Sequence, residues 1–209
     1  MTNRIPSYLE YLKTVAITTA GSGYTSPVTL LIDAPTGDSP IQATATATID
    51  FAGSGDITAI TVTEGGDGYV LTPSVKVSGP ATSVTSTTTS TGLDAGTYTA
   101  VEPTSTSGVG QFGTFTIVIN GDGDVTSITP VAGGSNYVQG DTISFLSTAL
   151  GGTGSESTVV GSITHISGGQ GGTLTAEIDI IAKADVSVSY THLRAHETVL
   201  DLVCRLLLE

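Results

Sequence analysis

The sequence predicts an all-β protein made of tandem small antiparallel β modules, sandwich-like or barrel-like, and three observations support this. Threonine and glycine are the commonest residues and tryptophan is absent, which favours strands joined by tight turns. Residues 42–50 (QATATATID) alternate alanine and threonine, the period of a half-buried strand. A Gly-x-Gly-Tyr turn between two strand-like segments recurs along the chain.

The chain begins with a segment, residues 1–13 (MTNRIPSYLEYLK), that mixes charged residues with tyrosine and leucine. It lacks the apolar stretch of a secretory signal. No window of the chain approaches 18 consecutive apolar residues, the length a membrane helix needs. We therefore expect a soluble protein without export by a signal peptide.

The first predicted module covers residues 14–80 and contains two copies of the turn. Residues 15–28 read VAITTAGSGYTSPV and residues 60–75 read ITVTEGGDGYVLTPSV, so Tyr24 and Tyr69 occupy the same place. The glycines supply the positive φ that the turn needs. The tyrosine ring is expected to pack over neighbouring strands with its hydroxyl near water.

Residues 81–92 (ATSVTSTTTSTG) have no hydrophobic period and are predicted to be a Ser/Thr linker. A second β module is predicted over residues 93–165. It contains a strand at 114–120 (TFTIVIN), a hairpin turn at 121–124 (GDGD), and a third turn copy at 128–143 in which Asn136 replaces a glycine. Asparagine tolerates positive φ, so this turn should survive.

A fourth, degraded copy of the turn begins at Ile163, and residues 166–188 are predicted to be a truncated third module. From Ser189 onward the chemistry changes, because SYTHLRAHETVLDLVCRLLLE is rich in leucine and holds the only cysteine, Cys204. A break this sharp indicates a foreign segment. The alternative is a short amphipathic helix for oligomerisation or docking, with Leu200, Val203 and Leu207 on one face.

The run GTYTAVEPTSTSGVGQFGTFTIVINGDGDVTSITPVAGGSNYVQGDTISFLSTALGG resembles a module of virion structural proteins from marine tailed bacteriophages. The resemblance covers residues 93–163, and the upstream Gly-Tyr pairs are similar to companion repeats of those proteins. It implies a tail, baseplate or fibre-associated component without catalytic residues. The last 20 or so residues, from 189 to 209, resemble translated sequencing-adapter read-through and are set aside as a non-native segment.

Several patterns could carry chemistry, and each has a simpler interpretation. Residues 108–113 (GVGQFG) fit G-x-G-x-x-G, but a dinucleotide site needs a strand before them and a helix after them. Residues 120–124 (NGDGD) and 65–69 (GGDGY) offer oxygen ligands for calcium, yet Val70 stands where the second pattern needs aspartate. In the final segment, His192 and His196 could share a metal, but no third ligand is evident.

Acid–base chemistry is not indicated either. The aspartates fall in predicted turns or at strand ends, and not in the buried or crowded setting that paired catalytic carboxylates need; they are Asp33, Asp38, Asp56, Asp67, Asp122 and Asp124. His165 lies in a predicted strand without a nucleophile pattern nearby, so we expect a surface or half-buried strand residue. No catalytic, cofactor-binding or metal-binding residue is therefore predicted, and no cofactor.

The predicted function is architectural: a non-enzymatic virion component, assembled in the host cytoplasm. The expected partners are other virion proteins or further copies of the chain, with a host-surface glycan as a further candidate. The formal net charge of −13 disfavours nucleic acid and anionic membranes. The main alternative is a bacterial cell-surface adhesin or carbohydrate-binding module, in which exposed tyrosines would stack on sugars. A glycan depolymerase would need paired carboxylates in a groove.

Overall fold

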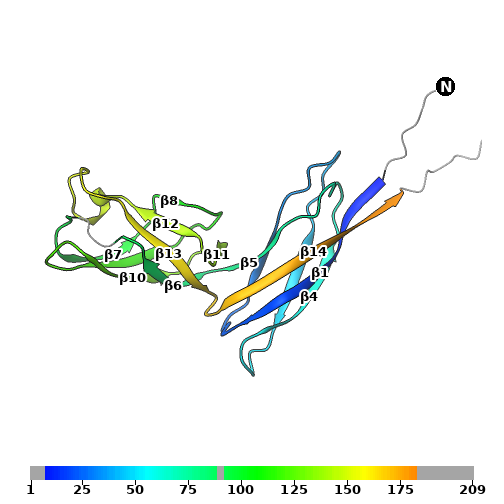
Figure 1. The fold of residues 1–209 in the computed structure, drawn as a ribbon, viewed down its shortest axis with the longest axis horizontal. Coiled ribbons are helices and arrows are strands. Elements are labelled where there is room, and N and C mark those ends of the chain that lie inside the picture. The colour runs from blue at the N-terminus through cyan, green and yellow to red at the C-terminus, as the bar shows by residue number, and fades with distance from the viewer. Residues whose placement is uncertain (1–7, 89–91, 183–209) are drawn as a thin grey trace, which may run out of the picture. The chain divides into compact units, whose positions relative to one another are not determined.

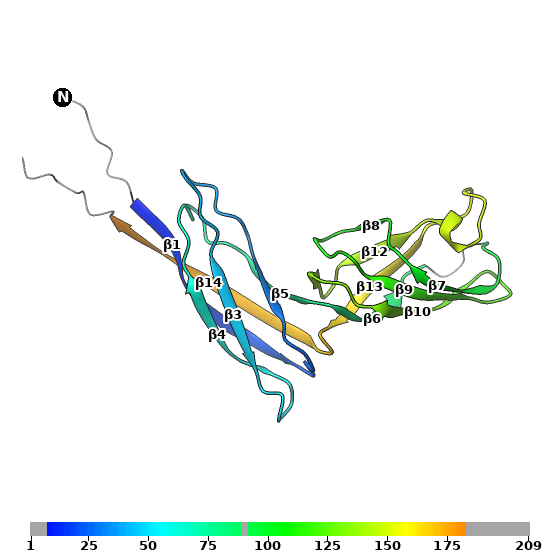
Figure 2. The same cartoon turned by 180° about the vertical axis from the view of Figure 1, so that it is seen from behind.

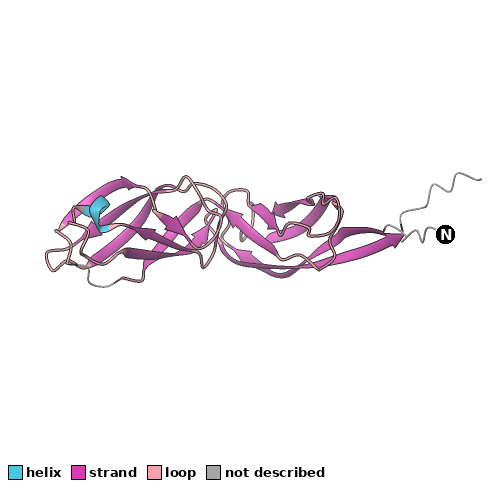
Figure 3. Cartoon of the chain, turned by 90° about the horizontal axis from the view of Figure 1, so that it is seen from above, coloured by secondary structure: helices cyan, strands magenta, loops and turns pink. Residues whose placement is uncertain are grey.

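The computed structural model describes residues 8–88 and 92–182. Residues 10–179 form one compact unit, and the described residues 8–9 and 180–182 lie outside it. Among the described residues the only helical element is the short 3₁₀ turn η1 (Ser147–Leu150), and strands make up the rest of the regular structure (Figure 3). The predicted all-β fold is confirmed. No helix in the described part of the chain could span a membrane.

Two long strands, β1 (Tyr8–Ser22) and β14 (Gln170–Ala182), lie side by side as a two-stranded sheet (Figures 1 and 2). Within the compact unit, Leu12, Val15 and Ala176 are buried in the core, although Leu12 and Val15 are three residues apart and so depart from strict strand alternation. β14 therefore completes the sheet that β1 begins. The prediction of a truncated third module at 166–188 is wrong for the described residues. Residues 170–182 form β14, which pairs with β1 at the start of the chain and is not part of a separate module.

Residues between these long strands form a hairpin and a small sheet. β3 (Thr44–Ile49) pairs antiparallel with β4 (Ile57–Glu64), and its alanines are half-buried while its threonines are exposed. This confirms the half-buried strand predicted from the Ala/Thr alternation. β2 (Thr29–Ile32) pairs with β5 (Val75–Gly79), which in turn pairs with β11 (Tyr137–Val138).

A seven-stranded sheet takes all its strands from residues 81–166. Its order is β7-β9-β10-β6-β13-β12-β8. The bounds are β6 (Ala81–Ser86), β7 (Gly96–Val101), β8 (Ser105–Thr106), β9 (Thr114–Ile119), β10 (Val125–Ala132), β12 (Thr142–Phe145) and β13 (Val159–Ile166).

The predicted Ser/Thr linker (81–92) is wrong over its first half, because β6 lies in the middle of this sheet, between β10 and β13. Val84 pairs with Ile128 on one side and with Ile163 on the other. β-branched threonine and valine suit such a pleated position. Of its six side chains only Ala81 is fully buried, so the sequence lacks the apolar alternation that would indicate a strand.

One continuous hydrophobic cluster draws on both predicted modules. It contains Tyr24 and Ile57 from the first and Phe115, Tyr137 and Phe145 from the second. The Phe115 ring meets the Tyr137 ring edge-on at 6.4 Å between centroids and the Phe145 ring at 5.6 Å, the favoured aromatic geometry. A smaller cluster lies under β1 and β14.

Candidate functional site

The three Gly-Tyr turns have the same backbone conformation. Their first glycines, Gly21, Gly66 and Gly134, have φ of 68°, 70° and 66°. The residue before each tyrosine is also left-handed, with φ of 78° at Gly23, 83° at Gly68 and 60° at Asn136. The expectation that asparagine would preserve the third turn is confirmed, since its short polar side chain tolerates this region.

Each turn lies against a short backbone segment from elsewhere in the chain. Ile41 and Asp67 exchange two backbone hydrogen bonds of 3.0 Å, and Gln111 and Ser135 do the same at 3.0 Å. The corresponding segment for the first turn is residues 170–172, the start of β14. A Cβ added to the first glycine of any turn would collide with that segment's backbone, so the close approach requires glycine.

The three turn tyrosines, Tyr24, Tyr69 and Tyr137, are at most 2% exposed. Each hydroxyl accepts a hydrogen bond from a backbone N–H of the facing segment: Tyr69 from Ala43 at 2.9 Å, Tyr24 from Gly172 at 3.2 Å, and Tyr137 from Gly113. Burial raises the pKa of Tyr24 and Tyr137. The buried rings confirm the core role, while the expectation that the hydroxyl stays near water is wrong for Tyr69.

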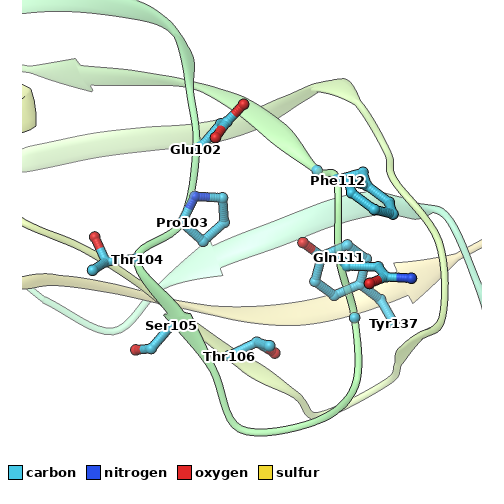
Figure 4. Close-up of a pocket in the computed structure, with 10 residues that line it drawn as sticks. Glu102, Pro103, Thr104, Ser105, Thr106, Gln111, Phe112 and Tyr137 are labelled. Carbon is cyan, nitrogen blue, oxygen red and sulfur yellow. The ribbon is translucent and has the colours of Figure 1, made fainter.

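A groove with a volume of about 300 Å³ lies beside the third turn. One wall is residues 102–106 and the other is residues 110–113, and the Tyr137 side chain also lines it. Figure 4 shows Glu102 and Pro103 on the opposite side of this space from Gln111 and Phe112. Phe112 is 80% exposed and has φ of 60°. The only sequence signal for this groove is the set of glycines around Phe112 in GVGQFG.

No family model, curated protein or solved structure matches the chain significantly.

The structure places the predicted GVGQFG segment (108–113) as a loop between β8 and β9. The NGDGD segment is the hairpin turn between β9 and β10, as predicted. The Asn120 side chain accepts the backbone N–H groups of Asp122 and Asp124 at 3.0 and 2.8 Å. The Asn120 side-chain oxygen therefore closes the turn. Because it already accepts these two hydrogen bonds, it is not a free ligand for a calcium ion.

Asp67 corrects the expectation that the aspartates occupy exposed turns. It is buried, and its Oδ1 accepts the N–H of Gly68 at 2.8 Å and that of Glu10 at 3.3 Å. The carboxylate thus joins β1 to the second turn. His165 is a half-buried residue of β13, as predicted, with Nδ1 3.2 Å from the Thr164 hydroxyl.

The remaining predicted residues are not gathered into a site. Asp33 follows β2 and accepts the N–H of Ser74 at 3.2 Å, while Asp38 and Asp56 lie in other loops. Over residues 8–88 and 92–182, no three metal-binding side chains cluster. His192, His196 and the whole of the set-aside segment 189–209 lie outside the described residues.

Glu156 was not among the residues predicted from the sequence. In the described chain its carboxyl group has the pKa that departs furthest from the ordinary value. Its carboxylate accepts the N–H of Thr153 at 2.9 and 3.0 Å, the Thr153 hydroxyl at 2.8 Å, and the N–H of Gly154 at 2.9 Å. These hydrogen bonds, led by the Thr153 N–H, lower the pKa of Glu156 from 4.5 to about 2. The Thr-x-x-Glu spacing was the signal in the sequence.

We expect the loop at residues 153–156 to lose its order only in strong acid. A lowered pKa means that the carboxylate's stabilising contribution is complete above pH 4.5 and disappears as the pH falls through about 2. Amide NMR shifts of Thr153 and Gly154 should therefore titrate with a midpoint near pH 2. Glu156→Gln, the matched control, should abolish this titration. A midpoint near 4.5 would contradict the hydrogen-bonded geometry.

Proposed function

We propose that this chain is a non-catalytic structural component of a bacteriophage virion, associated with the tail, baseplate or fibre. One structural observation supports an architectural role above all: the most distinctive residues of the sequence, the turn tyrosines, are buried and hold strands together. The resemblance of residues 93–163 to phage modules supplies the virion context. The expected partners are other virion proteins or copies of the chain itself.

The three turns explain how such a chain can serve as a rigid element. Each joins segments distant in sequence through backbone hydrogen bonds and one tyrosine hydroxyl. Residues 170–172 contact the first turn, although about 150 residues of chain separate them. Contacts of such long range resist local opening, because a turn cannot be released without separating two strands.

The adhesin or carbohydrate-binding alternative loses its original support. It required exposed tyrosines at the turns, but Tyr24, Tyr69 and Tyr137 are buried. Any recognition by this chain must therefore use other side chains.

The DNA flanking the gene tests the proposal directly. Capsid, terminase and tail genes beside it, together with peptides of this chain in purified virions by mass spectrometry, are the expected result. Neighbouring genes for secretion or cell-wall anchoring, with the protein recovered from cell surfaces, would instead establish the adhesin alternative.

A further inference from the structure

Phe112 combines two features that packing does not explain. Its side chain is 80% exposed, so the fold gains little from its apolar surface. Its φ of 60° lies in the left-handed region, which a bulky residue occupies only at a cost in energy. Backbone strain in a residue without a packing role is typical of a functional position.

The first turn supplies an internal comparison. Residues 170–172 lie against the first turn in the same way that residues 111–113 lie against the third turn. Gly171 is therefore the residue of the first turn that corresponds to Phe112. Gly171 has φ of 80°, which glycine adopts freely. A hollow of about 350 Å³ lies there too, lined by Tyr24, Gly171 and Gly172 among others. At this position the third turn has an exposed phenylalanine with a strained backbone, whereas the first turn has a glycine without strain.

The loop that carries Phe112 is held rigidly. Gly110 and Gly113 are buried, and a Cβ at Gly110 would overlap the Tyr137 ring. Gln111 is fixed by its two backbone hydrogen bonds to Ser135, each 3.0 Å long. The phenyl ring therefore belongs to a preorganised wall, which lowers the entropic cost of binding a ligand.

The two walls offer complementary chemistry. Phe112 gives an apolar ring face, and Pro103 gives an apolar surface on the opposite wall (Figure 4). Polar groups surround them: the Glu102 carboxylate accepts hydrogen bonds, the Gln111 amide donates and accepts, and the Thr106 hydroxyl does both. An apolar ring face bordered by such groups suits a sugar, whose C–H face stacks on aromatic rings while its hydroxyls bond to polar side chains.

We propose that this groove binds a pyranose ring of a neutral glycan, with Phe112 as the stacking platform and Glu102 and Gln111 as hydroxyl partners. Glu102 stands in the groove and the chain carries a formal net charge of −13, so sulfated, phosphorylated and uronic-acid glycans are repelled. The site goes beyond the architectural role and does not depend on it, because a virion protein and a cell-surface protein could both use it.

The test is an amide NMR titration of the full-length ¹⁵N-labelled chain with maltotriose, cellotriose, triacetylchitotriose and mannotriose, all of which are neutral. Contacts to one or two rings give dissociation constants of about 1 mM, so concentrations up to about 10 mM are needed. At least one trisaccharide should shift the amides of residues 102–106 and 110–113. The hairpin amides at 120–124 should not move, and an alginate trisaccharide should cause no shift.

Substitutions at Phe112 separate binding from folding. Phe112→Gly should weaken binding at least about tenfold while leaving the thermal midpoint unchanged or higher, because it removes left-handed strain. Phe112→Tyr keeps the ring and should bind within about threefold of the natural chain. Phe51→Ala is the matched control, since Phe51 is 55% exposed but lies outside the groove; it should leave binding unchanged.

Three results would overturn the proposal. They are the absence of a groove response to every neutral trisaccharide, binding that survives Phe112→Gly, and tighter binding of the alginate fragment than of any neutral sugar. Sedimentation adds a fourth: if Phe112→Gly converts an oligomer to a monomer, the groove is an interface between copies of this chain. None of these results bears on virion membership, which the flanking genes decide.

Discussion

Replacing Tyr69 by alanine is expected to lower the free energy of unfolding by about 3 to 5 kcal/mol, as other fully buried aromatic truncations do. The ring is 1% exposed and packs in the smaller cluster with Leu12 and Val75. Its removal leaves a cavity where β1 meets the second turn, and the backbone there cannot collapse because Tyr69 N–H also donates to Glu10 O at 2.9 Å.

Tyr69→Phe isolates the hydroxyl from the ring. In the natural protein the N–H of Ala43 donates to the Tyr69 hydroxyl at 2.9 Å. The phenylalanine variant leaves this N–H buried without a partner, which costs about 1 to 3 kcal/mol. Urea unfolding measures both variants, and the denaturation midpoint should fall while the slope stays constant. An unchanged midpoint for Tyr69→Ala would show that the ring does not stabilise the core and would reopen a recognition role for the turn tyrosines.

Local signals in the sequence were sufficient for β3, β9 and the turns. The Ala/Thr alternation identified β3, and Gly-x-Gly-Tyr identified left-handed turn residues, including Asn136. Burial of the turn tyrosines was also predictable, because a large ring beside a tight turn has neighbouring strands within reach. Each of these features depends on residues close in sequence.

Long-range pairing could not be predicted in the same way. β14 pairs with β1 across most of the chain, and nothing in either segment identifies the other. The hydroxyl partners of the turn tyrosines are backbone N–H groups, such as that of Ala43, which have no sequence signature. β6 was overlooked because its Ser/Thr composition is equally compatible with a linker.

The groove was hidden for a related reason. GVGQFG fits the pattern of a dinucleotide-binding loop, but its glycines let the chain lie against the Tyr137 ring. Only the three-dimensional structure reveals that Phe112 has a left-handed backbone and an exposed side chain. The opposite wall, residues 102–106, follows β7 and contains no motif.

The glycines of one turn should differ sharply in their response to alanine, and the second turn offers the best place to compare them. Gly66 has φ of 70°, and a Cβ there would lie 2.8 Å from the Ala43 nitrogen and would overlap the Ile41 carbonyl oxygen. Gly68 has φ of 83°, but its Cβ would meet only Pro40 and Gly37 carbons at 3.4 and 3.5 Å, an ordinary contact.

Gly68→Ala should therefore cost about 1 to 2 kcal/mol, the penalty of a left-handed residue with a Cβ. Gly66→Ala adds a collision with immovable backbone, so its total should reach about 2 to 5 kcal/mol. Gly68→Asn is the matched control, because Asn136 occupies the corresponding position of the third turn with φ of 60°; it should cost less than Gly68→Ala. Urea midpoints of the three variants decide the order. Equal losses at Gly66 and Gly68 would mean that the facing segment can retreat from the turn, and that backbone pairing at Ile41 does not hold the two together.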